Sequence, residues 1–302
     1  MNGKCTFCNK DGELKFGHII PKFVFSWFKE SSPSAIRLTI EPNKRVQDGE
    51  KQYLLCSDCE ELFSGWEKSF CEHLFLPLHH NPTLTTPIKY GPWALKFAVS
   101  VSWRVLMYYQ KFDDLHHLSK KQIETAQTAL NVWRGFLLGE LPHPGQFEQH
   151  LVPVDTIQSY SGSAISPFLN RYLLRSVHMS VICSNTWAIV YTKMGHLILF
   201  GFIQEDNHKR WKGTKLHVNK GLIMPRVYHL PKYIAKYFNE QANKAAEALA
   251  SVSPRQSQII HQAMLENADE LANSELFRAM QYDVLHSGEN AFKVTESEEA
   301  DK

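Results

Sequence analysis

Residues 53–67 read Tyr-Leu-Leu-Cys-Ser-Asp-Cys-Glu-Glu-Leu-Phe-Ser-Gly-Trp-Glu. The first three residues are typical of a short strand, and the residues after them indicate that a helix begins at Ser57. Along this helix, apolar residues recur every three or four positions, which predicts one buried stripe: Leu62, Phe63, Trp66, Phe70 and Leu74. The junction of strand and helix carries two cysteines two residues apart, Cys56 and Cys59.

A second cysteine pair of the same spacing lies near the N-terminus, and 47 residues separate the two pairs. Four thiolates from two such turns complete the tetrahedral shell that Zn²⁺ prefers, so we predict a structural zinc ion at Cys5, Cys8, Cys56 and Cys59. In a small module the metal substitutes for a core of insufficient size. The alternative, four unligated thiols, leaves the paired spacing unexplained. Cys71 and Cys183 have no partner at ligand spacing and are expected to be buried small side chains.

The segment between the cysteine pairs contains further strand and turn signals. Residues 14–20 are strand-like, residues 23–28 are aromatic, and a polar hairpin follows with Asp48-Gly49 at its tip. Four prolines between residues 76 and 92 then favour a domain boundary. We therefore expect three parts: a zinc-binding module at residues 1–80, a larger domain at residues 81–295, and a disordered acidic tail at residues 296–302.

The larger domain changes from helical to strand-rich and back to helical patterns. Two helices are predicted at its start, over residues 93–110 and 119–138, and Ser119 and Gln122 form a capping box for the second. A loop rich in Pro, Ser and Gly follows at residues 141–170. Helical patterns return over residues 232–250 and 254–282, the latter opened by Ser253-Pro254.

Between these helical regions the sequence is rich in β-formers. Three runs predict an antiparallel meander: residues 172–183, 187–192 and 196–203. Residues 214–218 are expected to add a fourth strand to it. Together with the helices, this meander predicts an α+β fold.

The composition excludes several classes of protein. The chain of 302 residues is 43% hydrophobic and 21% charged, which is typical of a folded protein. Its net charge of +2 excludes a strongly basic, histone-like binder, and no apolar run approaches the roughly 18 residues of a membrane span. The N-terminal residues lack the apolar core of a signal peptide, so we expect a cytoplasmic protein with reduced cysteines and no membrane partner.

Charge is distributed unevenly along the chain. Residues 1–80 carry a net charge of −1, residues 81–230 carry +8 and residues 231–302 carry −5. A basic middle region can bind an anionic polymer, although a solvated basic face with an acidic tail explains the same charges. One basic cluster with an aromatic residue is a candidate nucleic-acid-binding loop: Lys209, Arg210, Trp211, Lys212 and Lys215. An ordinary basic loop is the alternative.

The order of the N-terminal motifs resembles that of the HNH endonucleases. A cysteine pair is followed by a strand ending in Gly17-His18-Ile19-Ile20-Pro21, then by a second strand, and then by the second cysteine pair leading into a helix. The resemblance covers about residues 5–72. It implies an N-terminal ββα-metal zinc module of the HNH type, followed by a larger mixed domain that contains the antiparallel meander.

The resemblance also implies a chemistry. His18 matches the general base of phosphodiester hydrolysis, and Mg²⁺ or Mn²⁺ would be the catalytic cation. The family usually has an acidic ligand immediately before this histidine, where this chain has Gly17, and a His or Asn after the second cysteine pair, where it has Glu60. Because Glu60 and Glu67 are seven residues apart, they lie within about 20° of each other around a helix axis and could compensate as ligands.

Each of these three residues also has a structural alternative. His18 could brace the zinc loop by hydrogen bonding, Glu60 could be a first-turn acid favoured by the helix dipole, and Glu67 could merely be exposed.

Two hypotheses about function follow. In the first, the protein is an HNH-like endonuclease that acts on nucleic acid, with DNA as the expected substrate. The resemblance places such proteins in prokaryotic restriction or anti-phage defence, where the larger domain would hold the nucleic acid or a partner protein. In the second, the module has lost catalysis and serves as a zinc-stabilised module that binds nucleic acid or protein. The sequence does not indicate the oligomeric state.

Overall fold

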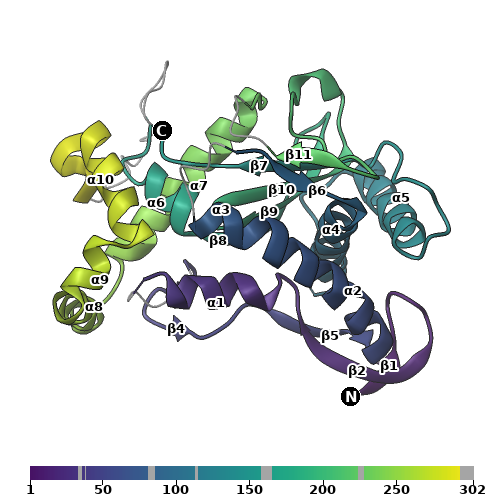
Figure 1. Ribbon diagram of the computed structural model, residues 1–302, viewed down its shortest axis with the longest axis horizontal. Helices are drawn as coiled ribbons and strands as arrows, with labels where there is room; N and C mark the ends of the chain where they lie inside the picture. The colour runs from purple at the N-terminus through teal and green to yellow at the C-terminus, as the bar shows by residue number, and fades with distance from the viewer. Residues whose placement is uncertain are drawn as a thin grey trace. The chain divides into compact units, whose positions relative to one another are not determined.

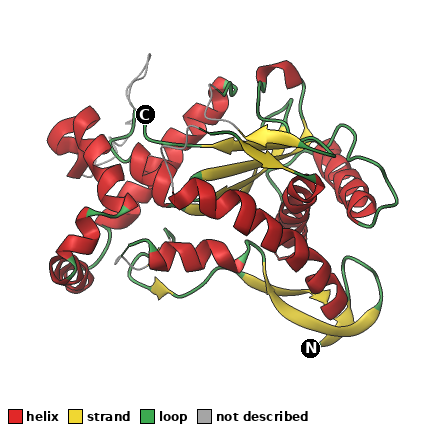
Figure 2. Cartoon of the chain, viewed as in Figure 1, coloured by secondary structure: helices red, strands yellow, loops and turns green. Residues whose placement is uncertain are grey.

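The computed structural model describes residues 1–32, 36–37, 39–80, 86–112, 115–157, 165–223 and 228–292. Within these residues, helices are combined with antiparallel strands, which confirms the α+β class (Figure 2). The acidic tail expected at residues 296–302 lies outside the described residues.

The chain divides into two compact units, each built from separate segments. Unit 1 contains Met1–Val24, Gly49–Pro153 and Val177–Leu230, and unit 2 contains Phe25–Asp48, Val154–Ser176 and Pro231–Lys302. Helix α1 (Lys22–Glu30) passes from the first unit to the second. This division does not follow the boundary expected near residue 80, because residues 49–80 and 86–153 belong to the same unit.

A small antiparallel sheet opens unit 1. It has the strand order β1-β2-β5, formed by β1 (Asn2–Lys4), β2 (Asp11–His18) and β5 (Lys51–Cys56). Helix α2 (Ser57–Phe70) begins directly after β5, as the sequence predicts, and it contacts both β2 and β5. A π-helical turn (Cys71–Phe75) and α3 (Leu76–His80) continue the chain. Two paired strands and a helix therefore surround the segment that ends at His18.

A four-stranded antiparallel sheet forms the other half of unit 1, in the order β7-β10-β9-β8. The predicted meander is present as β8 (Val177–Cys183), β9 (Ala188–Met194) and β10 (Leu197–Gln204). The fourth strand is β7 (Gln149–Pro153), within the segment that the sequence predicted to be loop. The predicted strand at residues 214–218 is instead limited to a single bridge between Lys215 and His150.

The buried core of unit 1 lies around α4 (Pro92–Phe112), which contacts α2 and all four strands of the larger sheet (Figure 1). Because it has neighbours on several sides, α4 buries an unbroken run of residues from Phe97 to Leu106. Helix α5 (Lys120–Leu137) packs beside it, and the predicted capping box of Ser119 and Gln122 is present. Strands β6 (Ile88–Tyr90) and β11 (Gly221–Ile223) form a separate antiparallel pair.

Unit 2 is mainly helical. Besides the short strand pair β3 (Ile36–Arg37) and β4 (Arg45–Val46), its helices run as follows: α6 (Leu169–Arg175), α7 (Lys232–Ala250), α8 (Pro254–Glu266), α9 (Ala268–Ala272) and α10 (Glu275–Ser287). A buried ion pair of 2.7 Å between Arg171 and Asp283 joins α6 to α10. Residues 172–175, where the sequence predicted the start of a strand, belong to α6, and three helices replace the single pattern predicted after Ser253.

None of the described helices is both long and apolar enough to cross a bilayer.

Candidate metal centre and the adjacent histidine

The first cysteine pair lies in a tight turn between β1 and β2. The backbone N–H of Asn9 donates to the carbonyl of Cys5 over 2.9 Å, and the N–H of Cys5 donates to the carbonyl of Lys10 over 2.9 Å. Asn9 has a positive φ of 63°, a conformation that Asn adopts more readily than most residues. This turn places the Cys5 and Cys8 sulfurs on the same side of the loop.

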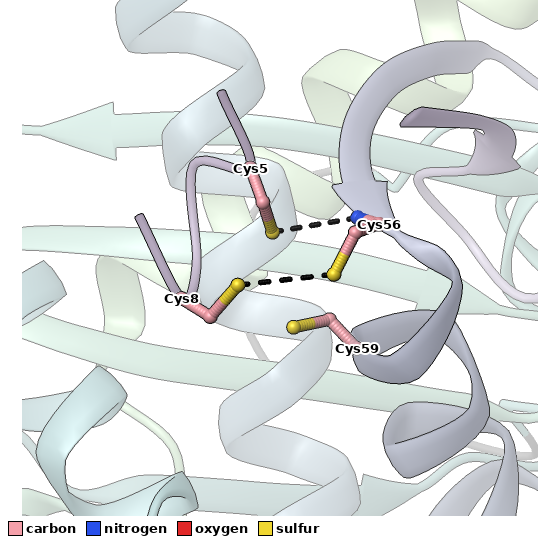
Figure 3. A group of neighbouring side chains, drawn as sticks. All are labelled: Cys5, Cys8, Cys56 and Cys59. Carbon is pink, nitrogen blue, oxygen red and sulfur yellow. Dashed lines mark hydrogen bonds between the residues drawn. The ribbon is translucent and has the colours of Figure 1, made fainter. Parts of the chain in front are cut away.

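The second cysteine pair lies where β5 becomes α2. Cys56 is the extended residue that precedes the helix, and Cys59 is in its first turn. The backbone N–H of Cys56 donates to the Cys5 sulfur over 3.4 Å, which connects the two pairs (Figure 3). The strand–helix junction predicted from sequence is therefore what positions the second pair of ligands.

The four sulfurs converge (Figure 3), and they all lie within 4.8 Å of one another. The Cys8 and Cys56 sulfurs are 3.8 Å apart. A tetrahedral ion with metal–sulfur bonds of about 2.3 Å requires sulfurs about 3.8 Å apart, so the spacing fits a four-thiolate metal site. The prediction that these four cysteines come together is confirmed, and their spacing is compatible with a structural zinc ion.

Three thiols of this cluster, those of Cys5, Cys8 and Cys59, have shifted pKa values. Burial acts to raise the pKa of Cys5, but hydrogen bonds from the backbone of Cys8, Cys56 and Phe7 outweigh it and lower the pKa to about 7. Burial raises the pKa of Cys8 and, more strongly, that of Cys59. The site is thus partly desolvated, with backbone donors directed at one sulfur, and a divalent cation at its centre would hold all four groups as thiolates.

The first cysteine turn is anchored in the core of unit 1 by Phe7. This side chain is fully buried, and its ring lies edge-on to Phe63 of α2 and Trp103 of α4, with centroids 4.9 and 5.2 Å away. The Arg134 side chain of α5 also donates to the Phe7 carbonyl. The metal centre is therefore packed against helices α4 and α5, which lie beyond the boundary expected near residue 80.

Gly17 and Glu60 are in direct contact, although one lies on β2 and the other on α2. A Cβ atom built on Gly17 would lie 2.9 Å from Glu60 Cδ and closer still to Oε1. The Glu60 carboxylate therefore occupies the space that a side chain at residue 17 would need. Burial raises the pKa of Glu60, an effect that nearby Arg104 opposes and Glu67 reinforces. In the described part of the chain, no group donates a hydrogen bond to this carboxylate.

Arg104 connects Glu67 to the end of β2. The Arg104 guanidinium lies 2.6 Å from a Glu67 carboxylate oxygen and donates to the His18 carbonyl over 3.1 Å. The arginine side chain is 3% exposed and that of Glu67 is 21% exposed, so this pair is largely shielded from water. Sequence patterns did not identify Arg104, because an arginine within an apolar helix gives no sign of which distant residues it meets.

His18 is the last residue of β2, and Glu60 reaches the preceding Gly17 from α2. The histidine is half-buried, and its Nε2 atom is shielded from solvent. Among the described residues, only the four cysteines bring three or more His, Cys, Asp or Glu ligand atoms within 4.8 Å of one another. His18, Glu60 and Glu67 thus do not converge on one point as a three-ligand site.

The residues predicted to bind nucleic acid occupy a loop of unit 1 with mixed exposure. Trp211 is 5% exposed, and its indole packs against Phe200 and Phe202, with centroids 4.9 and 5.0 Å away. This burial removes the ring face that the sequence offered for a base, so Trp211 stabilises the loop. Lys209 and Lys212 are exposed.

The other two basic residues of the loop form ion pairs. Arg210 lies 3.5 Å from Asp206, and Lys215 pairs with Glu148. Glu148 also accepts hydrogen bonds from His150 over 3.2 Å and from His208 over 3.1 Å. Burial acts to raise the pKa of Glu148, but these hydrogen bonds outweigh it and lower the pKa to about 2. Lys215 is therefore part of the hydrogen-bond network around Glu148, in addition to being exposed as a possible phosphate contact.

Comparison with known proteins adds no relative. No family model matches the chain, and neither does any curated protein or solved structure. The likeness to HNH endonucleases is thus limited to the residues quoted from the sequence.

Proposed function

We propose that the protein is a metal-dependent endonuclease of the HNH-like class that hydrolyses phosphodiester bonds in nucleic acid, with DNA as its substrate. The observation that carries this proposal is the position of the Glu60 carboxylate. The family's acidic residue before the histidine is replaced by Gly17, and the Glu60 carboxylate fills the space of that missing side chain. An acidic group therefore lies beside the residue that precedes His18, although it comes from helix α2.

The proposal gives each residue a separate role. His18, at the end of β2, is the general base that takes a proton from the attacking water. Glu60 is the ligand for Mg²⁺ or Mn²⁺, because Mg²⁺ is commonly held by one or two carboxylates with water and substrate phosphates. Such a cation would neutralise charge on the scissile phosphate. Glu67, which is already paired with Arg104, acts as a positioning residue in place of the ligand role expected from sequence.

Zn²⁺ is the proposed occupant of the four-cysteine cluster, with a structural role. Four thiolates close a zinc shell and leave no position for substrate, which is typical of structural sites. The ion would join the turn before β2 to the start of α2, and these are the two elements that carry His18 and Glu60. In the proposal, the exposed Lys209 and Lys212 contact the phosphate backbone, and the protein acts in cytoplasmic restriction or anti-phage defence.

Cleavage of plasmid and of single-stranded DNA in Mg²⁺ or Mn²⁺ tests the proposal. We expect His18→Ala and Glu60→Gln each to reduce the rate by at least about 100-fold, because each removes a group that acts in the chemical step. The matched controls are His261→Ala and Glu61→Gln, which change exposed residues of the same types and should cleave as the native chain does. Absence of cleavage by the native chain with either cation, or equal rates in all variants, would disprove the assignment.

A second function is favoured by a specific observation. His18, Glu60 and Glu67 do not converge, and the His18 Nε2 atom is shielded from solvent. Both findings suit a histidine that braces the zinc loop in a module that binds nucleic acid or protein without cleaving it. Native chain that retains nucleic acid in a gel-shift assay, yet leaves it intact with every cation, would favour this alternative.

A further inference from the structure

Two aromatic side chains are exposed together on the small sheet of unit 1. Phe16 of β2 and Tyr53 of β5 are direct cross-strand neighbours, with ring centroids 4.9 Å apart and planes inclined by 33°. Their side chains remain 57% and 36% exposed, respectively. The large aromatic side chains of the nearby core, such as Phe7 and Trp103, are buried almost completely. An exposed aromatic pair on a rigid strand pair is therefore a feature that packing does not require.

The next cross-strand pair on this face is His18 and Lys51. The register is unbroken from Phe16↔Tyr53 to His18↔Lys51, so the two pairs lie on the same face of the sheet. Two residues along a strand correspond to about 6.8 Å. A planar apolar surface thus lies next to an imidazole and an ammonium group, within the reach of one nucleotide from base to phosphate.

The acidic residues closest in sequence to this surface are engaged with other groups. Glu13 pairs with Lys15 over 2.9 Å, and Glu50 accepts a hydrogen bond from Gln52 over 3.0 Å. The ion pair with Lys15 offsets the charge of Glu13, and Lys51 supplies a positive charge on the same face as the rings. The charges around the aromatic pair would therefore allow a polyanion such as a nucleic acid to bind there.

We propose that Phe16 and Tyr53 form a stacking platform for an unpaired base, and that the chain binds single-stranded nucleic acid at the His18 end of β2. Bases stack on aromatic side chains without sequence preference, because each base has a π-face. In a duplex both faces of each base are covered by its neighbours, so a flat strand surface can stack only on an unpaired or extruded base. This inference rests on the proposed function, whose substrate it narrows to single strands or locally opened duplexes.

The test measures binding separately from cleavage. Fluorescence anisotropy of a labelled single-stranded DNA, a single-stranded RNA and a blunt DNA duplex would be recorded with the zinc-loaded full chain and without added Mg²⁺ or Mn²⁺. We expect Phe16→Ala and Tyr53→Ala each to weaken single-strand binding by about 5- to 100-fold, while duplex binding changes by less than about twofold. Phe16→Tyr and Tyr53→Phe keep both rings and should bind as the native chain does.

The matched control is Phe112→Ala, which removes an exposed aromatic side chain of α4 that lies against Tyr108. It should leave binding of all three probes unchanged. The dependence of single-strand affinity on salt should also be unaltered in the two platform variants, because the rings contact no phosphate. Circular dichroism and thermal unfolding identify any variant that fails to fold, and Phe16→Leu or Tyr53→Leu, which keeps an apolar side chain without a ring, then replaces it.

The outcomes separate this platform from the proposed nuclease. Equal losses on single strands and duplex, no loss in either alanine variant, or no single-strand binding by the native chain would overturn the platform even if plasmid cleavage is observed. Conversely, ring-dependent binding of single strands without cleavage in any cation would support the platform and refute the endonuclease. If the chain binds the single-stranded RNA and DNA probes with different affinities, and both depend on the two rings, the platform is supported. The probe that binds more tightly then indicates whether the natural ligand is RNA or DNA.

Discussion

At the scale of single residues, the end of β2 is shaped by side chains that come from other elements. Gly17 leaves a space that the Glu60 carboxylate fills, and Arg104 of α4 holds the His18 carbonyl and Glu67. The Glu60 carboxylate can therefore occupy its position only because residue 17 has no side chain.

Gly17→Ala should destabilise the native chain by about 1–3 kcal/mol, because the new Cβ would overlap the Glu60 carboxylate. In a Glu60→Ala background the same change should cost much less, and this coupling can be measured by urea unfolding in a double-mutant cycle. Gly12→Ala on the same strand is the control, since a Cβ there meets no atom within 4 Å. Additive effects of Gly17→Ala and Glu60→Ala would show that the contact is not formed.

Arg104→Met should lower the free energy of unfolding by about 3 kcal/mol, because it leaves the carboxylate of Glu67 shielded from water without its cation. The double variant Arg104→Met/Glu67→Gln should recover part of this loss, since it removes the uncompensated charge as well. Chemical unfolding of the two variants shows whether the double variant is the more stable of the two. If the double variant were no more stable than Arg104→Met, the ion pair would not be the cause.

Cys8→Ser should reduce bound zinc from one ion per chain to a small fraction, as measured by elemental analysis after dialysis. It should also cost several kcal/mol of stability, because the free energy of binding a structural zinc contributes directly to folding. Cys183→Ser is the control, since Cys183 lies outside the cluster and should leave the metal content unchanged. Equal zinc content in the two variants would contradict a site formed by the four cysteines.

At the scale of elements, local signals predict most of the boundaries that the structure shows. Helix α2 begins at Ser57, α5 is preceded by its capping box, and α8 has its cap at Ser253. These signals work because they involve residues within one helical turn. They fail for β7 and α6, which lie in or beside the segment with loop-like composition. All but the last residue of β7 are buried, so that strand depends on pairing with the distant β10.

Gln122 has a second contact that extends beyond its capping role. Its amide donates to the Ser184 carbonyl over 2.6 Å, in the connection between β8 and β9, while its carbonyl oxygen accepts from the Ser119 backbone. We expect Ser119→Ala to lower the free energy of unfolding by about 1 kcal/mol and Gln122→Ala by about twice as much, because only the second also removes the hydrogen bond from the buried Gln122 amide to Ser184. Thermal unfolding of the two variants measures this order, and an equal loss in both would contradict the tertiary role.

At the scale of the whole molecule, stability should depend on acid through the network around Glu148. Burial lowers the pKa of His150, so the unfolded chain gains a proton first as the pH falls below about 6.5, and stability declines. The pKa of Glu148 is about 2 in the folded chain. Its stabilising contribution is thus present above about pH 4.5 and is lost as the pH falls from there towards 2, up to about 3 kcal/mol.

This pH dependence can be measured by urea unfolding between pH 7 and pH 3. Glu148→Gln should flatten the part of the curve below pH 4.5 and leave the decline from His150 largely in place. Glu140→Gln, a change at an exposed carboxylate, is the control and should follow the native curve. A native curve that is flat below pH 4.5 would contradict the role of Glu148.

Short-range patterns are enough to predict the two cysteine pairs and most helices of this protein. A Cys-x2-Cys turn, a capping box and an apolar stripe each depend on residues that are close along the chain, so their geometry follows from local backbone conformation. The burial of Trp211, the role of Arg104 and the contact of Gly17 with Glu60 come from tertiary packing. The contacts of Arg104 and of Gly17 join residues more than 30 positions apart, and the burial of Trp211 fixes the exposure of a whole loop. Neither kind of feature follows from local sequence, because each depends on how the sheets and helices pack.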